Sequence, residues 1–108
     1  MTQAEIQWSD AEKEIARDAL KRAYDREAEA LIAYVREKAG KVSRPEDVWQ
    51  LHDFLSARRY GIDGKYDDRE DFLMFTISTL IKDNLLSLSE LNGLTADKRA
   101  KITVLTRM

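Results

Sequence analysis

Apolar residues recur at helical spacing along most of this 108-residue chain. Residues 9–39 contain neither Gly nor Pro and are rich in Ala, Glu, Lys, Arg and Leu, which favour helices. Ser9 and Glu12 have the spacing of a capping box, which begins a helix. The apolar positions of this stretch recur at helical spacing along one face: Ala16, Leu20, Ala23, Tyr24, Leu31 and Val35. The pattern therefore predicts a long helix over residues 9–39, with Glu27 as a charged exception on its apolar face.

A helix of that length is too long for a compact domain of this size. It extends roughly 46 Å at 1.5 Å per residue, whereas a compact domain of about 100 residues has a radius of gyration near 13 Å. We expect one end to project unless something packs on it, and a second copy of the chain is the simplest candidate. Opposite charges such as Lys21 and Asp25, four residues apart, indicate a solvated face.

The next pattern predicts a second helix of medium length. Gly40 ends the first helix, and Ser43 starts the second as its cap, with Glu46 as its capping-box partner. This helix runs to about Arg59. One edge carries Val48, Leu51 and Leu55, and the adjacent edge carries Trp49, His52, Asp53, Ser56 and Arg59.

Three short helices are predicted after a turn region at residues 60–71. The first covers roughly residues 67–84 and places Phe72, Phe75, Thr76, Thr79 and Leu80 at helical spacing. The second is capped at Ser87, with Glu90 as its box partner, and stops at Gly93. The third is capped at Thr95 and turns Ile102 and Leu105 inward. These elements predict an all-α fold in a single domain over residues 1–108, with an extended dimerising part near 9–60 and a compact C-terminal head near 61–108.

Composition excludes several functional classes. The chain has no cysteine and one histidine, so we expect no thiolate chemistry, no cofactor and no metal site. A net charge of −2 argues against nucleic-acid binding. No apolar run approaches a membrane span, and residues 1–10 lack the pattern of a signal peptide, so we expect a cytoplasmic protein without membrane insertion. The segment from Asp63 to Asp68 fails the calcium-loop pattern at its third and sixth positions.

The second helix carries the candidate site residues. His52 is either a core or surface histidine, an interface residue or, least favoured, an acid–base catalyst. Asp53 should not orient it, because adjacent side chains point about 100° apart around a helix. Asp53 and Arg59 are poor partners within one helix. They are either independent surface charges or a pair across a twofold axis that fixes the register of two crossing helices. Trp49 is either a core or an interface residue.

The residues Trp49 to Arg69 (WQLHDFLSARRYGIDGKYDDR) closely resemble the fluorescence recovery protein family of cyanobacteria. The similarity extends to Trp8-Ser9 at the start, to Tyr24–Glu27 within the long helix and to Ala96–Ile102 near the end, and so covers nearly the whole chain.

The resemblance implies an all-helical twofold homodimer without enzymatic activity. Members bind the orange carotenoid protein, a blue-light sensor that quenches phycobilisome excitation in its red, light-activated form. They engage mainly its C-terminal domain, accelerate its return to the orange form and release it from the phycobilisome on the thylakoid face. The partner-binding positions of the family correspond to Trp49, His52, Asp53, Arg59, Phe75 and Lys101. The expected dimer interface comprises Val48, Trp49, Leu51, His52, Asp53, Leu55 and Arg59.

Two other classes remain open from the residues alone. One is a relative from an organism without phycobilisomes, which would bind a different regulatory protein. The polar character of residues 70–94 leaves this class open. A helical dimer that only scaffolds would bind a partner without changing the partner's relaxation rate.

Overall fold

The computed structural model describes residues 7–108, and within them it contains four α-helices, two 3₁₀ helices and no strand. The all-α prediction is therefore confirmed for this part of the chain. Residues 1–6, which belong to the stretch where we expect no signal peptide, lie outside the described residues.

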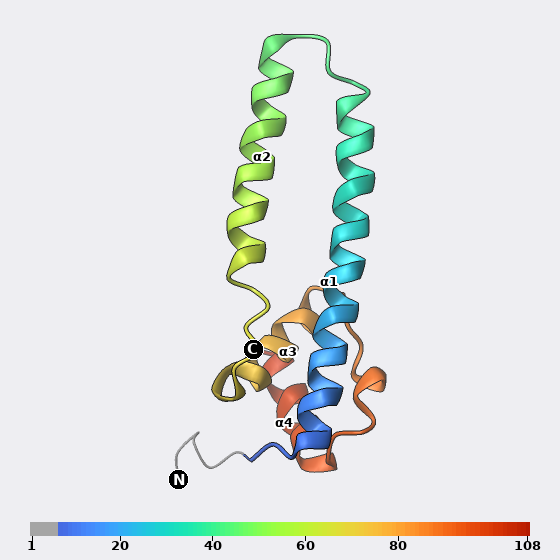
Figure 1. The fold of residues 1–108 in the computed structure, drawn as a ribbon, viewed down its shortest axis with the longest axis vertical. Coiled ribbons are helices and arrows are strands. Elements are labelled where there is room, and N and C mark those ends of the chain that lie inside the picture. Colours follow the sequence, from blue (N-terminus) through green and yellow to red (C-terminus); the bar gives the residue numbers. More distant parts are fainter. Residues whose placement is uncertain (1–6) are drawn as a thin grey trace.

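Helix α1 (Asp10–Ala39) runs the length of the molecule (Figure 1). Its capping box is formed as predicted: the Glu12 amide donates to Ser9 Oγ at 3.1 Å, and the Ser9 amide donates to Glu12 Oε1 at 3.1 Å. The described residues measure 56 × 25 × 25 Å, with a radius of gyration of 17.0 Å. The expected projection is thus present, but α2 of the same chain lies alongside it.

Helix α2 (Pro45–Asp63) begins and ends differently from the prediction. Pro45 takes the first helical position, which its fixed φ favours, so Arg44 is the N-cap and Asp47 occupies the third position. The Asp47 carboxylate accepts the Ser43 and Arg44 amides at 3.1 Å each, which corrects the predicted Ser43–Glu46 box. The predicted helix ends near Arg59, whereas the observed helix continues through Gly61 to Asp63. One glycine inside a helix costs only about 1 kcal/mol, which is too little to end it here.

The predicted third helix is shorter than residues 67–84. A 3₁₀ turn, η2 (Glu70–Phe72), precedes helix α3 (Leu73–Lys82). Asp67 stays outside the helix because its carboxylate accepts the Arg69 amide at 3.1 Å, a local bond that competes with helix formation. The helix ends in a Schellman motif: Asn84 has φ 61°, and the Leu85 amide donates to Leu80 O at 3.0 Å.

The last two elements complete the head. The predicted short helix is a 3₁₀ helix, η3 (Leu88–Leu91), and helix α4 (Ala96–Thr106) follows it. The Thr95 cap is confirmed, since its hydroxyl accepts the Lys98 amide at 3.3 Å. Ile102 is fully buried and Leu105 packs against the core, as predicted.

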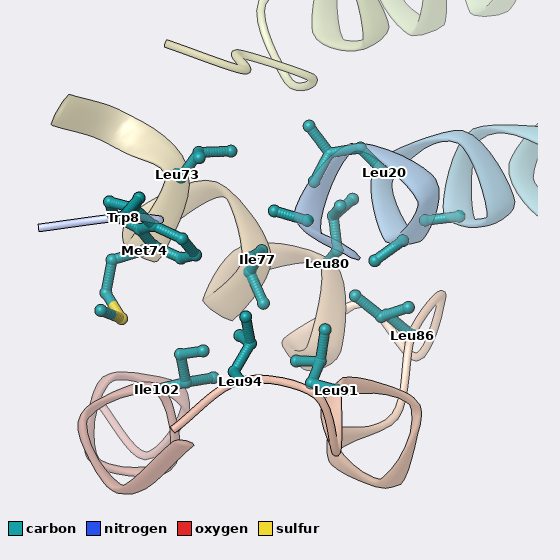
Figure 2. Packing of buried hydrophobic residues seen from close by; sticks show 13 residues of the cluster. Trp8, Leu20, Leu73, Met74, Ile77, Leu80, Leu86, Leu91, Leu94 and Ile102 are labelled. Carbon is teal, nitrogen blue, oxygen red and sulfur yellow. The ribbon is translucent and has the colours of Figure 1, made fainter. Parts of the chain in front are cut away.

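The core lies entirely at one end of the molecule. Figure 2 shows how its buried side chains pack together. The start of α1 packs there against α3 and η3, and α4 packs against both of these elements. The fully buried side chains of α3 and η3 include Ile77, Leu80 and Leu91. No residue between 28 and 72 is buried. Two members of the predicted stripe, Phe72 and Phe75, are exposed, because Leu73, Ile77 and Leu80 form the inward face of α3. We call residues 28–63 the hairpin, and residues 7–27 with 64–108 the head.

Candidate partner-binding surfaces

Helix α2 presents the predicted site residues to solvent. Trp49 is 63% exposed, and the side chains of His52 and Arg59 are 66% and 86% exposed. No residue of α2 is buried. The core interpretations of Trp49 and His52 are therefore wrong for this chain, which leaves surface or interface roles.

Contacts within this exposed strip are local. His52 Nδ1 lies 3.2 Å from Asp53 Oδ1, so the expectation that Asp53 cannot orient His52 is wrong. Rotation about the side-chain bonds of two exposed neighbours closes the gap that their backbone directions leave open. Arg59 pairs with Asp63 at 3.8 Å, one turn further along the helix.

The inner edge of α2 makes the hairpin contact. Leu51 and Leu55 are half-buried, while Val48 remains 46% exposed. Phe54 stacks on Tyr34 of α1, with ring centroids 4.4 Å apart. The hairpin is therefore held by partly exposed contacts, and the apolar edge at Val48 is left uncovered in the single chain.

The head carries the other two predicted contact residues. Phe75 is 67% exposed on α3. Lys101 on α4 is exposed, and its ammonium group lies 3.4 Å from the Asp97 carboxylate. Neither side chain contributes to the core, so both are available to another molecule.

The contacts of Glu27 explain why a charged residue lies on the apolar face of α1. Its side chain is 5% exposed and accepts three donors: Tyr66 Oη at 2.6 Å, Arg58 Nη2 at 2.9 Å and Lys65 Nζ at 3.2 Å. Lys65 also pairs with Asp83, at the end of α3, at 2.7 Å. We call these five residues the Glu27 cluster. The sequence signal was Glu27 itself, but its partners come from elsewhere in the chain and no spacing rule indicates them.

The protonation states of this cluster follow from its geometry. Burial alone would raise the pKa of Glu27, but the hydrogen bonds from Tyr66 and Lys65 and the charges of Lys65 and Arg58 outweigh it and lower that pKa. Burial and the bond to Glu27 raise the pKa of Tyr66 far above its ordinary value. The lowered pKa of Glu27 and the raised pKa of Tyr66 mean that an ionised carboxylate accepts the hydrogen bond of a neutral phenol near pH 7.

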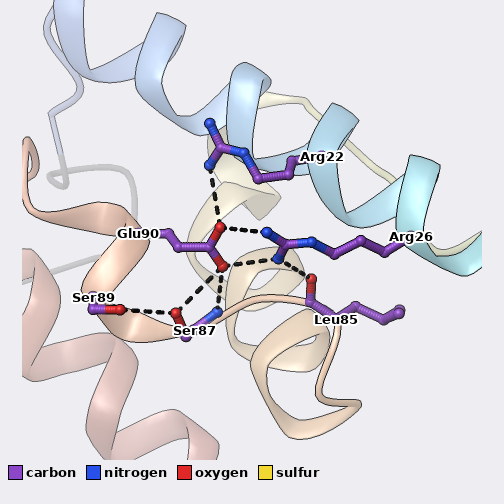
Figure 3. A network of polar contacts seen from close by, with 6 residues as sticks. All are labelled: Arg22, Arg26, Leu85, Ser87, Ser89 and Glu90. Atoms are coloured by element: carbon purple, nitrogen blue, oxygen red, sulfur yellow. Dashed lines mark hydrogen bonds and ion pairs between the residues drawn. The ribbon is translucent and has the colours of Figure 1, made fainter.

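Two further carboxylates join η3 and α4 to the start of α1 within the head. Figure 3 shows Glu90 of η3 in a bidentate pair with Arg26, at 2.7 and 2.8 Å, while Arg26 also donates to Leu85 O at 2.9 Å. The Arg26 hydrogen bond lowers the pKa of Glu90 to about 2. At the other end of the head, Glu12 accepts Lys98 Nζ at 3.1 Å. The capping-box bond with Ser9, more than the Lys98 contact, lowers the pKa of Glu12.

These features define a class of protein. Within the described residues, no group of three or more His, Cys, Asp or Glu side chains is arranged to hold a metal ion. None of the described helices combines the length and apolarity that crossing a membrane requires. What the structure offers instead is large aromatic side chains exposed on a slender helical scaffold, the pattern of a protein that acts by contacting another protein.

Comparison with known proteins gives the family. Residues 8–106 match the model of the photoprotection regulator fluorescence recovery protein. The fluorescence recovery protein of Synechocystis is 45% identical over 105 residues, which are 97% of this chain and 96% of that protein. The chain belongs to the fluorescence recovery protein family, whose members regulate photoprotection.

Solved structures agree with this assignment. The fluorescence recovery protein of Fremyella diplosiphon is 52% identical, with a TM-score of 0.91 over 94% of this chain and 100% of that chain. The Synechocystis structure is 44% identical, with a TM-score of 0.92 and the same coverage.

Proposed function

We propose that this chain binds the light-activated red form of the orange carotenoid protein, mainly through the sensor's C-terminal domain. Binding accelerates the return to the orange form and the release from the phycobilisome, so that antenna fluorescence recovers. Family membership supports the regulatory role, and one structural observation carries the proposal. The residues that the family resemblance singles out, with Trp49 and Phe75 as the largest, are exposed and are not part of the core.

The mechanism is a shift in the population of sensor states. A partner accelerates reversion only if it binds the transition state, or a state near the product, more tightly than the red state. We propose that two surfaces supply this preference. The α2 surface comprises Trp49, His52, Asp53 and Arg59, and the head surface comprises Phe75 and Lys101. Together they hold the separated sensor domains near their closed geometry, without making or breaking a bond.

The first experiment follows the red-to-orange absorbance change of photoactivated sensor in the dark. We expect wild-type chain to accelerate recovery, and Trp49→Leu or Phe75→Ala to slow it because each removes the largest apolar group of its surface. Ile32→Ala is the matched control, since Ile32 is a 52% exposed apolar residue of α1 that belongs to neither surface.

Each outcome of that experiment has a distinct meaning. Full rate in both the Trp49 and Phe75 variants would contradict the two-surface mechanism. Saturable binding by wild-type chain without any change in rate would favour the scaffolding alternative. No binding at all would favour a regulator of another protein.

We further propose that two copies form a twofold dimer through α2. The interface comprises Val48, Trp49, Leu51, His52, Asp53, Leu55 and Arg59. One observation supports it: no residue of α2 is buried in the single chain. A twofold axis would also let Asp53 of one copy pair with Arg59 of the other. A bidentate pair of that kind would fix the register of the two helices.

Val48→Glu tests the dimer. A glutamate at this position would place an unpaired charge in an apolar interface, so we expect the dimer to dissociate. Sedimentation velocity measures the mass, and Val104→Glu adds the same charge to an exposed apolar site of the head as the control. A Val48→Glu variant that sediments as an unchanged dimer would contradict this interface.

A further inference from the structure

We infer that the Glu27 cluster is a joint that fixes the direction of α2 relative to the head. Glu27 and Tyr66 are therefore positioning residues for the two proposed contact surfaces. The inference rests on the proposed function for what those surfaces do, but the geometry it describes belongs to the protein alone.

The cluster lies where the hairpin meets the head. Its single buried carboxylate, on α1, accepts donors from the last turns of α2 through Arg58 and from the following segment through Lys65 and Tyr66. Lys65 extends the contact to the end of α3 through Asp83, at 2.7 Å. Three stretches that are distant in sequence, near residues 27, 58–66 and 83, are thus linked: the first two through Glu27 and the third through Lys65.

Few other contacts hold α2 against the head. No residue of α2 or of the segment up to residue 72 is buried, whereas α3 and α4 pack extensively on each other. The stacked pair Tyr34 and Phe54 holds α2 to α1 further up the hairpin. At the lower end, the polar cluster is therefore the main directional constraint on α2.

The chemistry of the cluster favours a positioning role over a purely stabilising one. Glu27 continues the apolar face of Ala16, Leu20 and Ala23, where a hydrocarbon side chain would pack well. A buried ion pair often stabilises no more than such a replacement, because desolvation offsets the attraction. Hydrogen bonds to a carboxylate, however, are directional, and three of them define where the attached elements lie. Apolar attraction alone is not directional.

Two substitutions test the joint with little change in shape. Tyr66→Phe keeps the ring that meets Tyr24 edge-on, with centroids 5.4 Å apart, and removes only the hydroxyl that donates to Glu27. Glu27→Gln keeps the side-chain shape and removes the charge. The control is Glu90→Gln, which also disrupts a carboxylate–arginine pair. The native Glu90–Arg26 pair joins η3 to α1 and does not involve α2.

The decisive readout is a distance. The chain has no cysteine, so Ser56→Cys on α2 and Ala100→Cys on α4, both exposed, introduce the only two labelling sites. Spin labels at these positions give the distance between α2 and α4 by pulsed electron paramagnetic resonance, and that distance depends on the angle between α2 and the head. Dilution with unlabelled chain suppresses signals between copies. We expect a narrow distance distribution in the parent and in Glu90→Gln, and a broader or shifted one in Tyr66→Phe and Glu27→Gln.

Recovery kinetics separate this inference from the proposed function. In unlabelled protein we expect Tyr66→Phe to slow recovery about fivefold. Loss of one hydrogen bond to a charged group changes the equilibrium between the fixed and the displaced position of α2 by at least that factor. Glu90→Gln should leave the rate near wild type. An unchanged distance distribution in both cluster variants would overturn the joint. If the distances respond but wild-type chain does not accelerate recovery, the joint stands and the proposed function fails.

Discussion

The two ends of this molecule are built on different principles. The head buries a continuous apolar core between the start of α1 and the elements α3, η3 and α4, whereas residues 28–72 bury no side chain. Yet both ends share the same 30-residue helix, α1. The head thus carries the stability of the fold, while the hairpin offers surface. A pair of helices without a buried face is marginal by itself, so its order depends on the head and on whatever covers it.

The largest expected effect is loss of head packing. Ile77→Ala removes a fully buried side chain, and large-to-small core changes of this kind cost about 2–5 kcal/mol. Ile32→Ala, at a 52% exposed position of the hairpin, should change the free energy of unfolding far less. Urea denaturation of dilute protein, at a concentration where it sediments as a monomer, measures both. Equal losses would show that the hairpin contributes as much stability as the head.

The next effect concerns acid stability of the head. The pKa of Glu90 falls from its ordinary value of 4.5 to about 2 on folding, chiefly through Arg26. A lowered pKa in the folded state means that this contribution is complete above about pH 4.5. It is then lost as the pH falls through 2.

Glu90→Gln tests that contribution. We expect it to cost about 1 kcal/mol at pH 7, a value discounted for solvent screening of a partly exposed pair. The difference between wild type and variant should shrink between pH 4.5 and 2. Thermal melts across that range provide the measurement, and a difference that stays constant with pH would contradict the assignment to ionised Glu90.

The smallest effect lies in the hairpin. The stacked rings of Tyr34 and Phe54 are both partly exposed, so we expect a coupling energy of about 0.5 kcal/mol, at the lower end for aromatic pairs. A double-mutant cycle of Tyr34→Leu and Phe54→Leu measures it. Additive effects of the two substitutions would show that the stacked pair adds nothing beyond the packing of each ring. The Glu27 cluster would then be the main contact between α1 and α2.

Local patterns in the sequence predicted most of the helices. The Ser9–Glu12 box and the Thr95 cap are formed because capping depends on residues three positions apart. The same logic misplaced the start of α2 by one residue because Pro45 sets the register there. The third helix was predicted too long, because Asp67 forms a local bond and Asn84 adopts a left-handed conformation, which hydrophobic periodicity does not reveal.

The site was only partly accessible to such reasoning. Spacing placed Trp49 and His52 on one edge of a helix, but it did not decide whether that edge faces a core or solvent. Glu27 was visible as an anomaly, whereas Arg58, Lys65 and Tyr66 were not, since they lie more than thirty positions away in the chain. Long-range polar contacts leave no periodic signal. The proposal of the α2 and head surfaces accordingly uses family resemblance and exposure, and not spacing.

The two tryptophans divide between the two ends, with an optical consequence. Trp8 is 6% exposed in the head, with the Lys98 ammonium 5.3 Å from its ring, while Trp49 is 63% exposed on the hairpin. An indole in water emits at longer wavelength than one packed among hydrocarbon, so the two emission components are separable. Trp8 reports the integrity of the head, and Trp49 reports whatever covers α2. Unmodified protein therefore carries two native fluorophores that distinguish unfolding from partner binding in a single emission spectrum.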